Sequence, residues 1–229
     1  MLHITPIATV RSCFAEKFGV PRQPGLCPSA YGTLVFEPAF RSQEAIRGIE
    51  GFSHLWLVFG FHETADRGWS PTVRPPRLGG NERVGVFASR STFRPNGLGL
   101  SLIKLERIET HPTDGPVLHL SGIDLIDRTP VFDIKPYLGY AEAIPNARSG
   151  FAADAIPRLA VEISDAARPA FHALPARDQQ VIREALALDP RPPAGANEPG
   201  RRFGTRMCGM HVHFTVVEAT CVVLSVSAD

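Results

Sequence analysis

Residues 53–62 read SHLWLVFGFH, a run of aromatic, apolar and β-branched side chains that ends at a glycine and a histidine. Such a run predicts a β-strand. Trp56 stands between Leu55 and Leu57, and we expect it in the core. Six further segments have the same character and are also expected to be strands: 3–10, 31–37, 83–91, 98–109, 116–126 and 131–137. Short strands at this spacing predict a barrel or a sandwich rather than a doubly wound sheet.

The remaining segments are helical or irregular. A short helix is expected at Ser42–Ile49, capped by Ser42, and long loops at 12–30 and 63–83. Beyond Tyr140 we expect a strand at 159–164 and a helical stretch at 167–188, in which Pro175 marks a kink or a second start. A Pro/Gly-rich loop at 189–202 leads to a terminal strand pair at 207–227.

Composition and missing motifs exclude several classes of protein. The 229 residues carry a net charge of +1. Hydrophobic residues make up 44% and charged residues 21% of the chain, which is an ordinary composition for a globular protein. No apolar run approaches the roughly 18 residues of a membrane span, and the N-terminus does not read as a signal peptide. The four cysteines lack zinc-site spacing, so we expect buried, reduced thiols in a cytoplasmic protein. Rossmann, P-loop, HExxH and GxSxG motifs are absent.

The segment 67–97 is the most basic part of the chain. It holds six arginines against the single acid Glu82, a local charge of +5. We expect Val84, Val86 and Phe87 to fix its middle as strand residues, and residues 94–97 to form a tight turn. Arginines on loops held by a sheet suit a phosphate or carboxylate site. The alternative is a solvated basic loop.

A second group of polar residues lies in GIDLIDRTPVFDIKPY, residues 122–137. Asp133, Lys135 and Tyr137 alternate onto one strand face, and residues 127–130 read as the turn before that strand. The alternative is structural: Asp127 caps the turn, and Lys135 neutralises Asp133. Lys135 and the lack of histidine argue against a divalent metal, so no metal is expected.

Several separated motifs resemble one known family. They are AEKFGVPRQPG (15–25), GFSHLWLVF (51–59), TVRPPRLGGN (72–81), GVFASRSTFRPN (85–96) and DIKPYLGYAE (133–142). In this order they resemble the tRNA (N6-threonylcarbamoyladenosine(37)-N6)-methyltransferase family, also described as TsaA-like or TrmO-like. The resemblance is strong over residues 1–142 and weak beyond them.

The resemblance implies an S-adenosylmethionine-dependent enzyme that methylates N6 of threonylcarbamoyladenosine at position 37 of threonine tRNAs. It implies a mainly β fold, α+β overall: a single-sheeted β-barrel domain over residues 1–142 that binds the cofactor. A small α+β domain over residues 143–229 would recognise tRNA. It also implies a cytoplasmic homodimer with no membrane partner.

The resemblance also carries over a set of cofactor residues: Gln23, Pro24, Gly25, His62, Glu63, Arg90, Leu100, Asp124, Leu125, Ile126 and Asp127. Candidates for tRNA phosphate contacts are Arg74, Arg77, Arg201, Arg202 and Arg206, and Arg94 or Asn96 would bind the threonylcarbamoyl carboxylate. Departures from the family pattern are Gly97-Leu98 in place of Pro-Ile, Arg128 where glycine is common, and a divergent tail.

The chemistry of the reaction suggests the catalytic residues. Methyl transfer from a sulfonium is an in-line displacement, so positioning matters more than a covalent nucleophile. The accepting nitrogen is a poor nucleophile until its proton leaves. We therefore expect Asp133 or Tyr137 to accept or relay that proton, with Lys135 tuning it.

Two other functions compete with this one. In the first, the chain is a non-catalytic RNA-binding barrel whose arginine loop binds RNA and whose acidic turn is structural. In the second, it is a small-molecule methyltransferase on the same barrel, with no dependence on the arginines.

Overall fold

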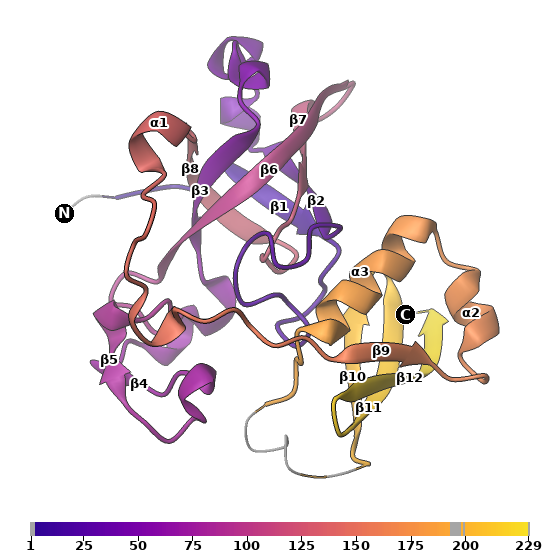
Figure 1. Cartoon of the computed structure of the whole chain (residues 1–229). Helices are drawn as coiled ribbons and strands as arrows, with labels where there is room; N and C mark the ends of the chain where they lie inside the picture. The colour runs from indigo at the N-terminus through magenta and orange to yellow at the C-terminus, as the bar shows by residue number, and fades with distance from the viewer. Residues whose placement is uncertain (1–2, 193–197, 199, 229) are drawn as a thin grey trace. The chain divides into compact units, whose positions relative to one another are not determined.

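Six strands form a closed β-barrel in the computed structural model, which describes residues 3–192, 198 and 200–228 (Figure 1). Their order around the barrel is β1-β2-β7-β6-β3-β8. The strands are β1 (Ala8–Ser12), β2 (Tyr31–Phe36), β3 (His54–Gly60), β6 (Leu98–His111), β7 (Gly115–Ser121) and β8 (Thr129–Pro136). The mainly β fold class with a β-barrel is therefore confirmed.

Strand β3 shows how the barrel separates its two faces. Leu55, Leu57 and Phe59 are at most 6% exposed, because the period of two turns every second side chain inward. Trp56 therefore lies on the outer face, half-buried, where its indole N–H donates to Glu142 Oε1 at 2.9 Å. The expectation that Trp56 belongs to the core is wrong.

Short 3-10 helices replace the helix expected at Ser42–Ile49. They are η2 (Gln43–Ile46) and η3 (Ile49–Gly51), and Ser42 makes no side-chain capping bond. Gly48 separates them at φ 84°, a left-handed conformation that stops a continuous helix. The expectation of one capped helix is therefore wrong.

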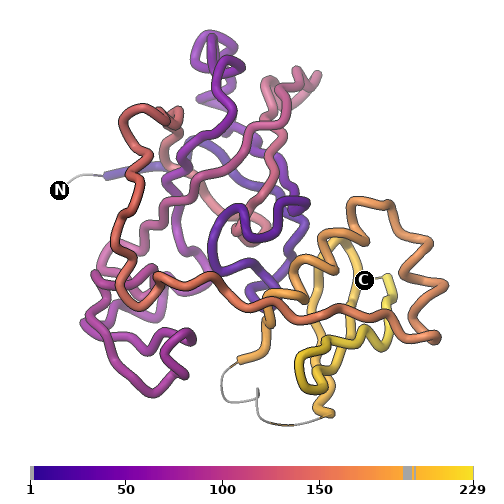
Figure 2. The backbone as a smooth tube through the Cα atoms, viewed as in Figure 1, coloured from indigo at the N-terminus to yellow at the C-terminus, as the bar shows by residue number. Residues whose placement is uncertain are grey.

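Residues 61–97 form an excursion from the barrel between β3 and β6 (Figure 2). They contain η4 (His62–Arg67), η5 (Pro76–Leu78) and a two-stranded ladder of β4 (Thr72–Val73) and β5 (Val84–Gly85). The strand expected at 83–91 ends at Gly85, because the chain then turns into η6 (Val86–Ala88). Val86 is 1% exposed and Phe87 is 75% exposed, so Phe87 does not belong to a strand core.

The C-terminal part contains a four-stranded sheet of order β10-β11-β12-β9, with α2 (Arg168–His172) and α3 (Ala176–Ala187) packed against it (Figure 1). The strands are β9 (Ala160–Ile163), β10 (Arg202–Met207), β11 (Met210–Val217) and β12 (Thr220–Ala228). Pro175 is the N-cap of α3, which confirms a second helix start there. The expected terminal strand pair is confirmed as β11 and β12, and β10 is a further strand that precedes it. Positions 193–197 and 199 of the predicted Pro/Gly-rich loop lie outside the described residues. The connector contains α1 (Gly139–Glu142) and η7 (Gly150–Ala152).

Contacts divide the chain into two units. The first contains Met1–Val10, Thr33–Leu120 and Arg128–Ala155, and the second contains Arg11–Gly32, Ser121–Asp127 and Ile156–Asp229. Within the second unit, Phe14 pairs with Met207, and the Phe18 ring stacks on Phe203 and Phe214 at 6.4 and 6.2 Å. The first loop is thus anchored on the C-terminal sheet.

The four cysteines are free thiols, and three of them are buried, as expected. Cys208 is half-buried. Burial raises the pKa of the Cys221 thiol to about 12, so this sulfur is a poor nucleophile at neutral pH. Within the described part of the chain, no helix has the length and apolar character needed to cross a membrane.

Candidate functional site

Two predicted site residues share one row on the outer face of the barrel. Asp133 on β8 lies opposite Val58 on β3, and Val58 lies opposite Leu100 on β6. Neighbouring strands are about 4.8 Å apart, which places the backbones of Asp133 and Leu100 roughly 10 Å from each other. Leu100 is 54% exposed, so the row presents an apolar surface beside a carboxylate.

A β-bulge turns Asp133 outward. Val58 pairs with Asp133 but Phe59 pairs with Val131, so Phe132 is an extra residue between two inter-strand pairs. Val131 is fully buried inside the barrel. Without the extra residue, the period of two would put Asp133 on the same inward face as Val131. The bulge therefore makes this carboxylate available to solvent.

Asp133 and Lys135 form an ion pair on this face. Lys135 Nζ lies 3.2 Å from Asp133 Oδ2, and the backbone N–H of Ile134 donates to Asp133 Oδ1 at 2.9 Å. This is the contact that the structural alternative expected. The side chains are 50% and 68% exposed, so the pair contributes little to stability and leaves Asp133 accessible.

Tyr137 belongs to an aromatic cluster rather than to the ion pair. Its ring meets those of Trp56 and His54 edge-on, at 6.2 and 6.4 Å between centroids, and its N–H donates to the His54 carbonyl. Lys135 lies opposite Trp56, two residue pairs along the strands from Asp133 and Val58. The three predicted catalytic residues thus share one face, where Asp133 and Lys135 contact each other and Tyr137 contacts aromatic rings instead.

Predicted cofactor residues of the first unit also lie where β3 leads into the excursion. His62 and Glu63 begin η4, and the N–H of Phe61 donates to the Gly97 carbonyl at 2.8 Å. This bond joins the end of β3 to the turn before β6. Gly97 has φ 59°, which proline cannot adopt, so its departure from the family pattern changes the backbone at this turn.

Three arginines of the segment 67–97, namely Arg77, Arg83 and Arg94, donate hydrogen bonds to neutral oxygens. Arg77 donates to the carbonyls of Ala152 and Asp154, and Arg83 donates to the Thr72 hydroxyl at 2.8 Å. Carbonyl and hydroxyl oxygens do not cancel a guanidinium charge, so these contacts position the charge and preserve it. Arg74 and Arg90 are exposed.

Arg94 and Asn96 differ in their surroundings. Arg94 Nη1 donates to the carbonyls of Val86 and Ser89 at 3.2 and 2.8 Å, so this side chain holds the turn at η6. Asn96 is exposed in the next turn. Their role in binding the threonylcarbamoyl carboxylate stays a prediction.

In the second unit, two predicted cofactor segments touch through glycines. The N–H of Gly25 donates to the Gly122 carbonyl at 2.8 Å. Gly122 has φ 67°, and a Cβ there would lie 3.4 Å from Gly25 Cα, so a side chain would crowd this approach. Gln23 and Pro24, just before it, are half-buried.

The turn at residues 124–127 is held by Ser12. The Ser12 N–H donates to Asp127 Oδ1 at 3.0 Å, and its hydroxyl donates to the Leu125 carbonyl at 2.6 Å. Asp127 therefore acts as the turn cap that the structural alternative described. The side chain of Leu125 is buried, Ile126 and Asp124 are half-buried, and Asp124 Oδ1 has no solvent access. Arg128 follows at φ 63°, a conformation that accounts for glycine there in the family.

Three predicted tRNA-binding arginines lie at β10: Arg202 and Arg206 are part of the strand, and Arg201 directly precedes it. Arg202 and Arg206 are exposed while Phe203, Thr205 and Met207 are buried, which puts the two arginines on the solvent face of the sheet. Arg206 pairs with Glu16 at 3.3 Å, and Arg201 pairs with Glu198 at 2.9 Å. Arg202 donates to the Ser225 hydroxyl at 3.3 Å.

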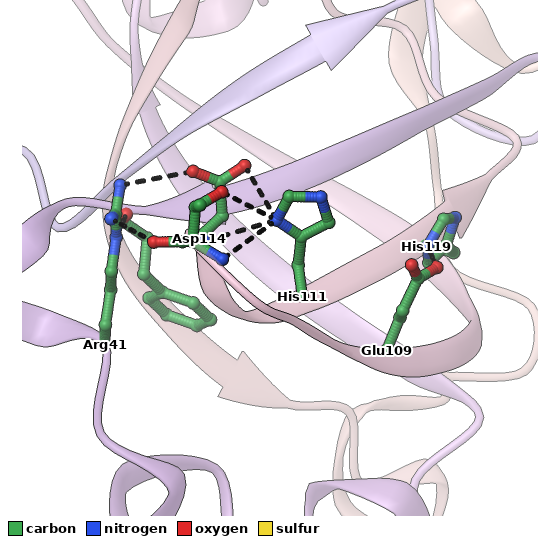
Figure 3. A network of polar contacts seen from close by, with 7 residues as sticks. Arg41, Glu109, His111, Asp114 and His119 are labelled. Atoms are coloured by element: carbon green, nitrogen blue, oxygen red, sulfur yellow. Dashed lines mark hydrogen bonds and ion pairs between the residues drawn. The ribbon is translucent and has the colours of Figure 1, made fainter.

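Sequence reasoning missed a polar network at the β6–β7 hairpin (Figure 3). At its tip, Asp114 contacts Arg41 at 3.7 Å and His111 at 3.5 Å. Arg41 also donates to the carbonyls of Phe36 and Thr113. Arg41 comes from a distant part of the sequence, so no local spacing signals this contact.

The stem of the hairpin carries a second group of charges. Glu109 contacts Arg107 at 2.8 Å and His119 at 2.9 Å. Hydrogen bonds from Arg107 and then His119 hold the pKa of Glu109 below its ordinary value of 4.5. We call Arg41, Arg107, Glu109, His111, Asp114 and His119 the hairpin network. It pairs its charges internally, which is typical of a structural network.

Comparisons with known proteins match the whole described chain. The model of the tRNA-methyltransferase O N-terminal domain matches residues 9–143, and that of the TrmO C-terminal domain matches residues 156–229. The tRNA (adenine(37)-N6)-methyltransferase of Escherichia coli is 46% identical, covering 93% of this chain and 92% of the relative. A putative S-adenosylmethionine-dependent methyltransferase, RcsF of Pseudomonas aeruginosa, is 49% identical over 92% and 91%. The crystal structure of TrmO from Pseudomonas aeruginosa superposes with a TM-score of 0.82 at 43% identity, over 100% of this chain and 99% of that one.

Proposed function

The chain belongs to the tRNA-methyltransferase O family, and on that premise we propose that it methylates N6 of threonylcarbamoyladenosine at position 37 of threonine tRNAs. It is an S-adenosylmethionine-dependent tRNA methyltransferase acting at position 37, as its relatives are named. The threonylcarbamoyl group and the threonine tRNAs are the finer part of the proposal, supported by the motif resemblance. We also propose that it works as a cytoplasmic homodimer.

The observation that carries the proposal is the outward row of Asp133, Val58 and Leu100. It combines an accessible carboxylate with an apolar surface on a rigid barrel wall, and a bulge is needed to form it. A carboxylate on such a wall is suited to accepting a proton from a nitrogen held next to it.

The residues present fit S-adenosylmethionine. Its carboxylate would be held by the exposed guanidinium of Arg90, and Leu100 offers apolar surface. His62 and Glu63 would contribute from η4. The predicted cofactor residues of the second unit are Gln23, Pro24, Gly25 and residues 124–127, and the bond from the Gly25 N–H to the Gly122 carbonyl holds their two segments together. When bound, the cofactor supplies an electrophilic methyl group on its sulfonium.

Asp133 then accepts the N6 proton of the target adenosine. Lys135, at 3.2 Å, orients the carboxylate. Tyr137, fixed against Trp56 and His54, orders the end of the same face. The proton moves to a group that water reaches, so it can return to solvent after each turnover.

Substrate binding falls to the arginines. Arg74 and Arg77 contact tRNA phosphates in the first unit, and Arg201, Arg202 and Arg206 contact them in the second. Arg202 donates to a hydroxyl, so its charge is not neutralised by that contact, whereas Arg201 and Arg206 contact carboxylates. Arg202 therefore contributes more to phosphate binding than the other two. Arg94 or Asn96 recognises the threonylcarbamoyl carboxylate.

Mass spectrometry of nucleosides tests the proposal. Threonine tRNA from cells lacking the activity is incubated with the protein and S-adenosylmethionine, beside a control tRNA without the threonylcarbamoyl group. We expect one added methyl group on threonylcarbamoyladenosine and none in the control. Cofactor binding without methylation of any nucleoside would indicate a small-molecule acceptor. Absence of both would leave a non-catalytic RNA-binding barrel.

A further inference from the structure

Phe87 exposes 75% of its surface, while its neighbour Val86 exposes 1%. The η6 turn separates the two side chains, sending Val86 into the interior and Phe87 toward solvent. A single exposed apolar residue needs no explanation by itself. Three further features distinguish this one.

The first feature is a rigid backbone around Phe87. The N–H of Val86 donates to the Pro71 carbonyl at 3.0 Å, and the Ser89 hydroxyl donates to the Val86 carbonyl at 2.9 Å. Arg94 donates to the carbonyls of both Val86 and Ser89. The ring is therefore presented from a fixed turn, so a partner that contacts it pays little ordering entropy.

The second feature is a cation against the ring. The guanidinium carbon of Arg94 lies 5.9 Å from the centroid of Phe87, so the side chain that clamps the turn also contacts the π face. The exposed remainder of the ring is open to solvent. An aromatic ring with an arginine beside it is the surface on which proteins stack unpaired bases.

The third feature is the charge of the surrounding segment. Residues 67–97 carry six arginines and one acid, and Arg77 and Arg83 donate to neutral oxygens. A second exposed aromatic in this segment, Trp69 at 55%, precedes Ser70, whose N–H donates to the Phe93 carbonyl. A second copy of the chain would bring an equally positive segment to the patch, which is unfavourable. A polyanion fits it.

We propose that Phe87 is a stacking platform for an unpaired base in the anticodon loop of the tRNA, with Arg94 positioning the ring and the segment's arginines contacting the flanking phosphates. This inference rests on the proposed function, because it takes tRNA as the ligand. It adds that residues 67–97, in the excursion between β3 and β6, bind the single-stranded loop. Duplex RNA, whose bases are already stacked, is not bound by Phe87.

Binding of a fluorescent anticodon stem-loop RNA, without cofactor, tests the platform. The matched ligand is a duplex RNA of equal length. Phe87→Leu keeps the apolar volume but removes the π face, and Phe87→Tyr keeps the ring. Ile144→Ser removes a comparably exposed side chain (72%) outside the basic segment. We expect Phe87→Leu to bind the stem-loop roughly tenfold more weakly, since base stacking on an aromatic ring has that worth. Phe87→Tyr and Ile144→Ser should match the wild type, and all four proteins should bind the duplex equally.

Three outcomes would overturn the platform. Equal stem-loop binding by Phe87→Leu and wild type is one, and a parallel loss of duplex binding is another, because it signals lost charge or fold. A change of oligomeric state in Phe87→Leu, measured by sedimentation, would assign the ring to a contact between copies. Methyl transfer distinguishes this failure from that of the proposed function: a wild type that binds loops through Phe87 but methylates no tRNA keeps the platform and loses the enzyme assignment.

Discussion

The hairpin network and the basic segment 67–97 are both rich in arginine and use it in opposite ways. In the hairpin network Arg41 and Arg107 meet the carboxylates of Asp114 and Glu109. In the basic segment Arg77, Arg83 and Arg94 donate to carbonyl or hydroxyl oxygens. A carboxylate cancels the charge of an arginine, whereas a carbonyl only positions it. The group that each arginine contacts, more than the number of arginines in a region, distinguishes a structural region from a binding surface.

The largest expected effect is on kcat, and it should distinguish Asp133 from Asp114, two carboxylates that each contact a basic side chain. Asp133→Asn should lower kcat for tRNA methylation about 100-fold or more, because it removes the proton acceptor. Asp114→Asn, in the hairpin network, should leave kcat unchanged. Steady-state kinetics measure both, with calorimetric titration of the cofactor to show intact binding. Full turnover by Asp133→Asn would remove this residue from the mechanism.

Salt dependence tests whether the basic segment contacts phosphates. Arg74→Ala and Arg77→Ala should each weaken tRNA binding and reduce the slope of log K against log salt by roughly 0.7–0.9. Arg77→Lys keeps the charge and should keep the slope. Arg41→Ala, whose charge is already paired, serves as the control. Unchanged slopes for Arg74→Ala and Arg77→Ala would contradict the assignment.

Substitutions in the hairpin network should lower the stability of the fold more than substitutions in the basic segment, the reverse of their expected effects on tRNA binding. Arg41→Met removes two hydrogen bonds to carbonyls and the contact with Asp114, and should lower the free energy of unfolding by about 1 kcal/mol. Arg74→Met, at an exposed position, should stay within about 0.5 kcal/mol of the wild type. Urea denaturation measures both. Equal destabilisation would erase the distinction between the two regions.

The smallest effect is a pH dependence from Glu109. Its pKa is lowered in the folded protein, so its ionised form stabilises the fold above pH 4.5, and this contribution is lost as the pH falls through the folded pKa. The difference in unfolding free energy between wild type and Glu109→Gln should therefore shrink between pH 6 and pH 3. A difference independent of pH would show that Glu109 acts only through packing.

Most of the barrel could be predicted from local patterns. Alternation and β-branched content located the strands at 31–37, 53–62, 98–109 and 131–137 to within a few residues, because a strand with one buried face carries its period in its sequence. The same rule failed at 83–91. There the backbone of η6 is held by Arg94 and Ser89 through bonds that no apolar pattern encodes.

The candidate site was predictable as a set of residues but not as a geometry. The motifs indicated Asp133, Lys135 and Leu100, and the ion pair of the first two follows from their spacing. That Asp133 and Leu100 share one outer row depends on the pairing of β8, β3 and β6. The contact of Gly25 with Gly122 likewise joins segments about a hundred residues apart.

The sequence alone determined the family, the mainly β fold and the residue types of the site, because these depend on local composition and on motifs that each lie within a short stretch. The tertiary structure decided which way those residues face. One extra residue at Phe132 reverses the alternation and turns Asp133 to the solvent, and one arginine clamp turns Phe87 out of a predicted strand. Side-chain direction in a strand changes with every single-residue shift of register, and register is set by partners distant in the chain.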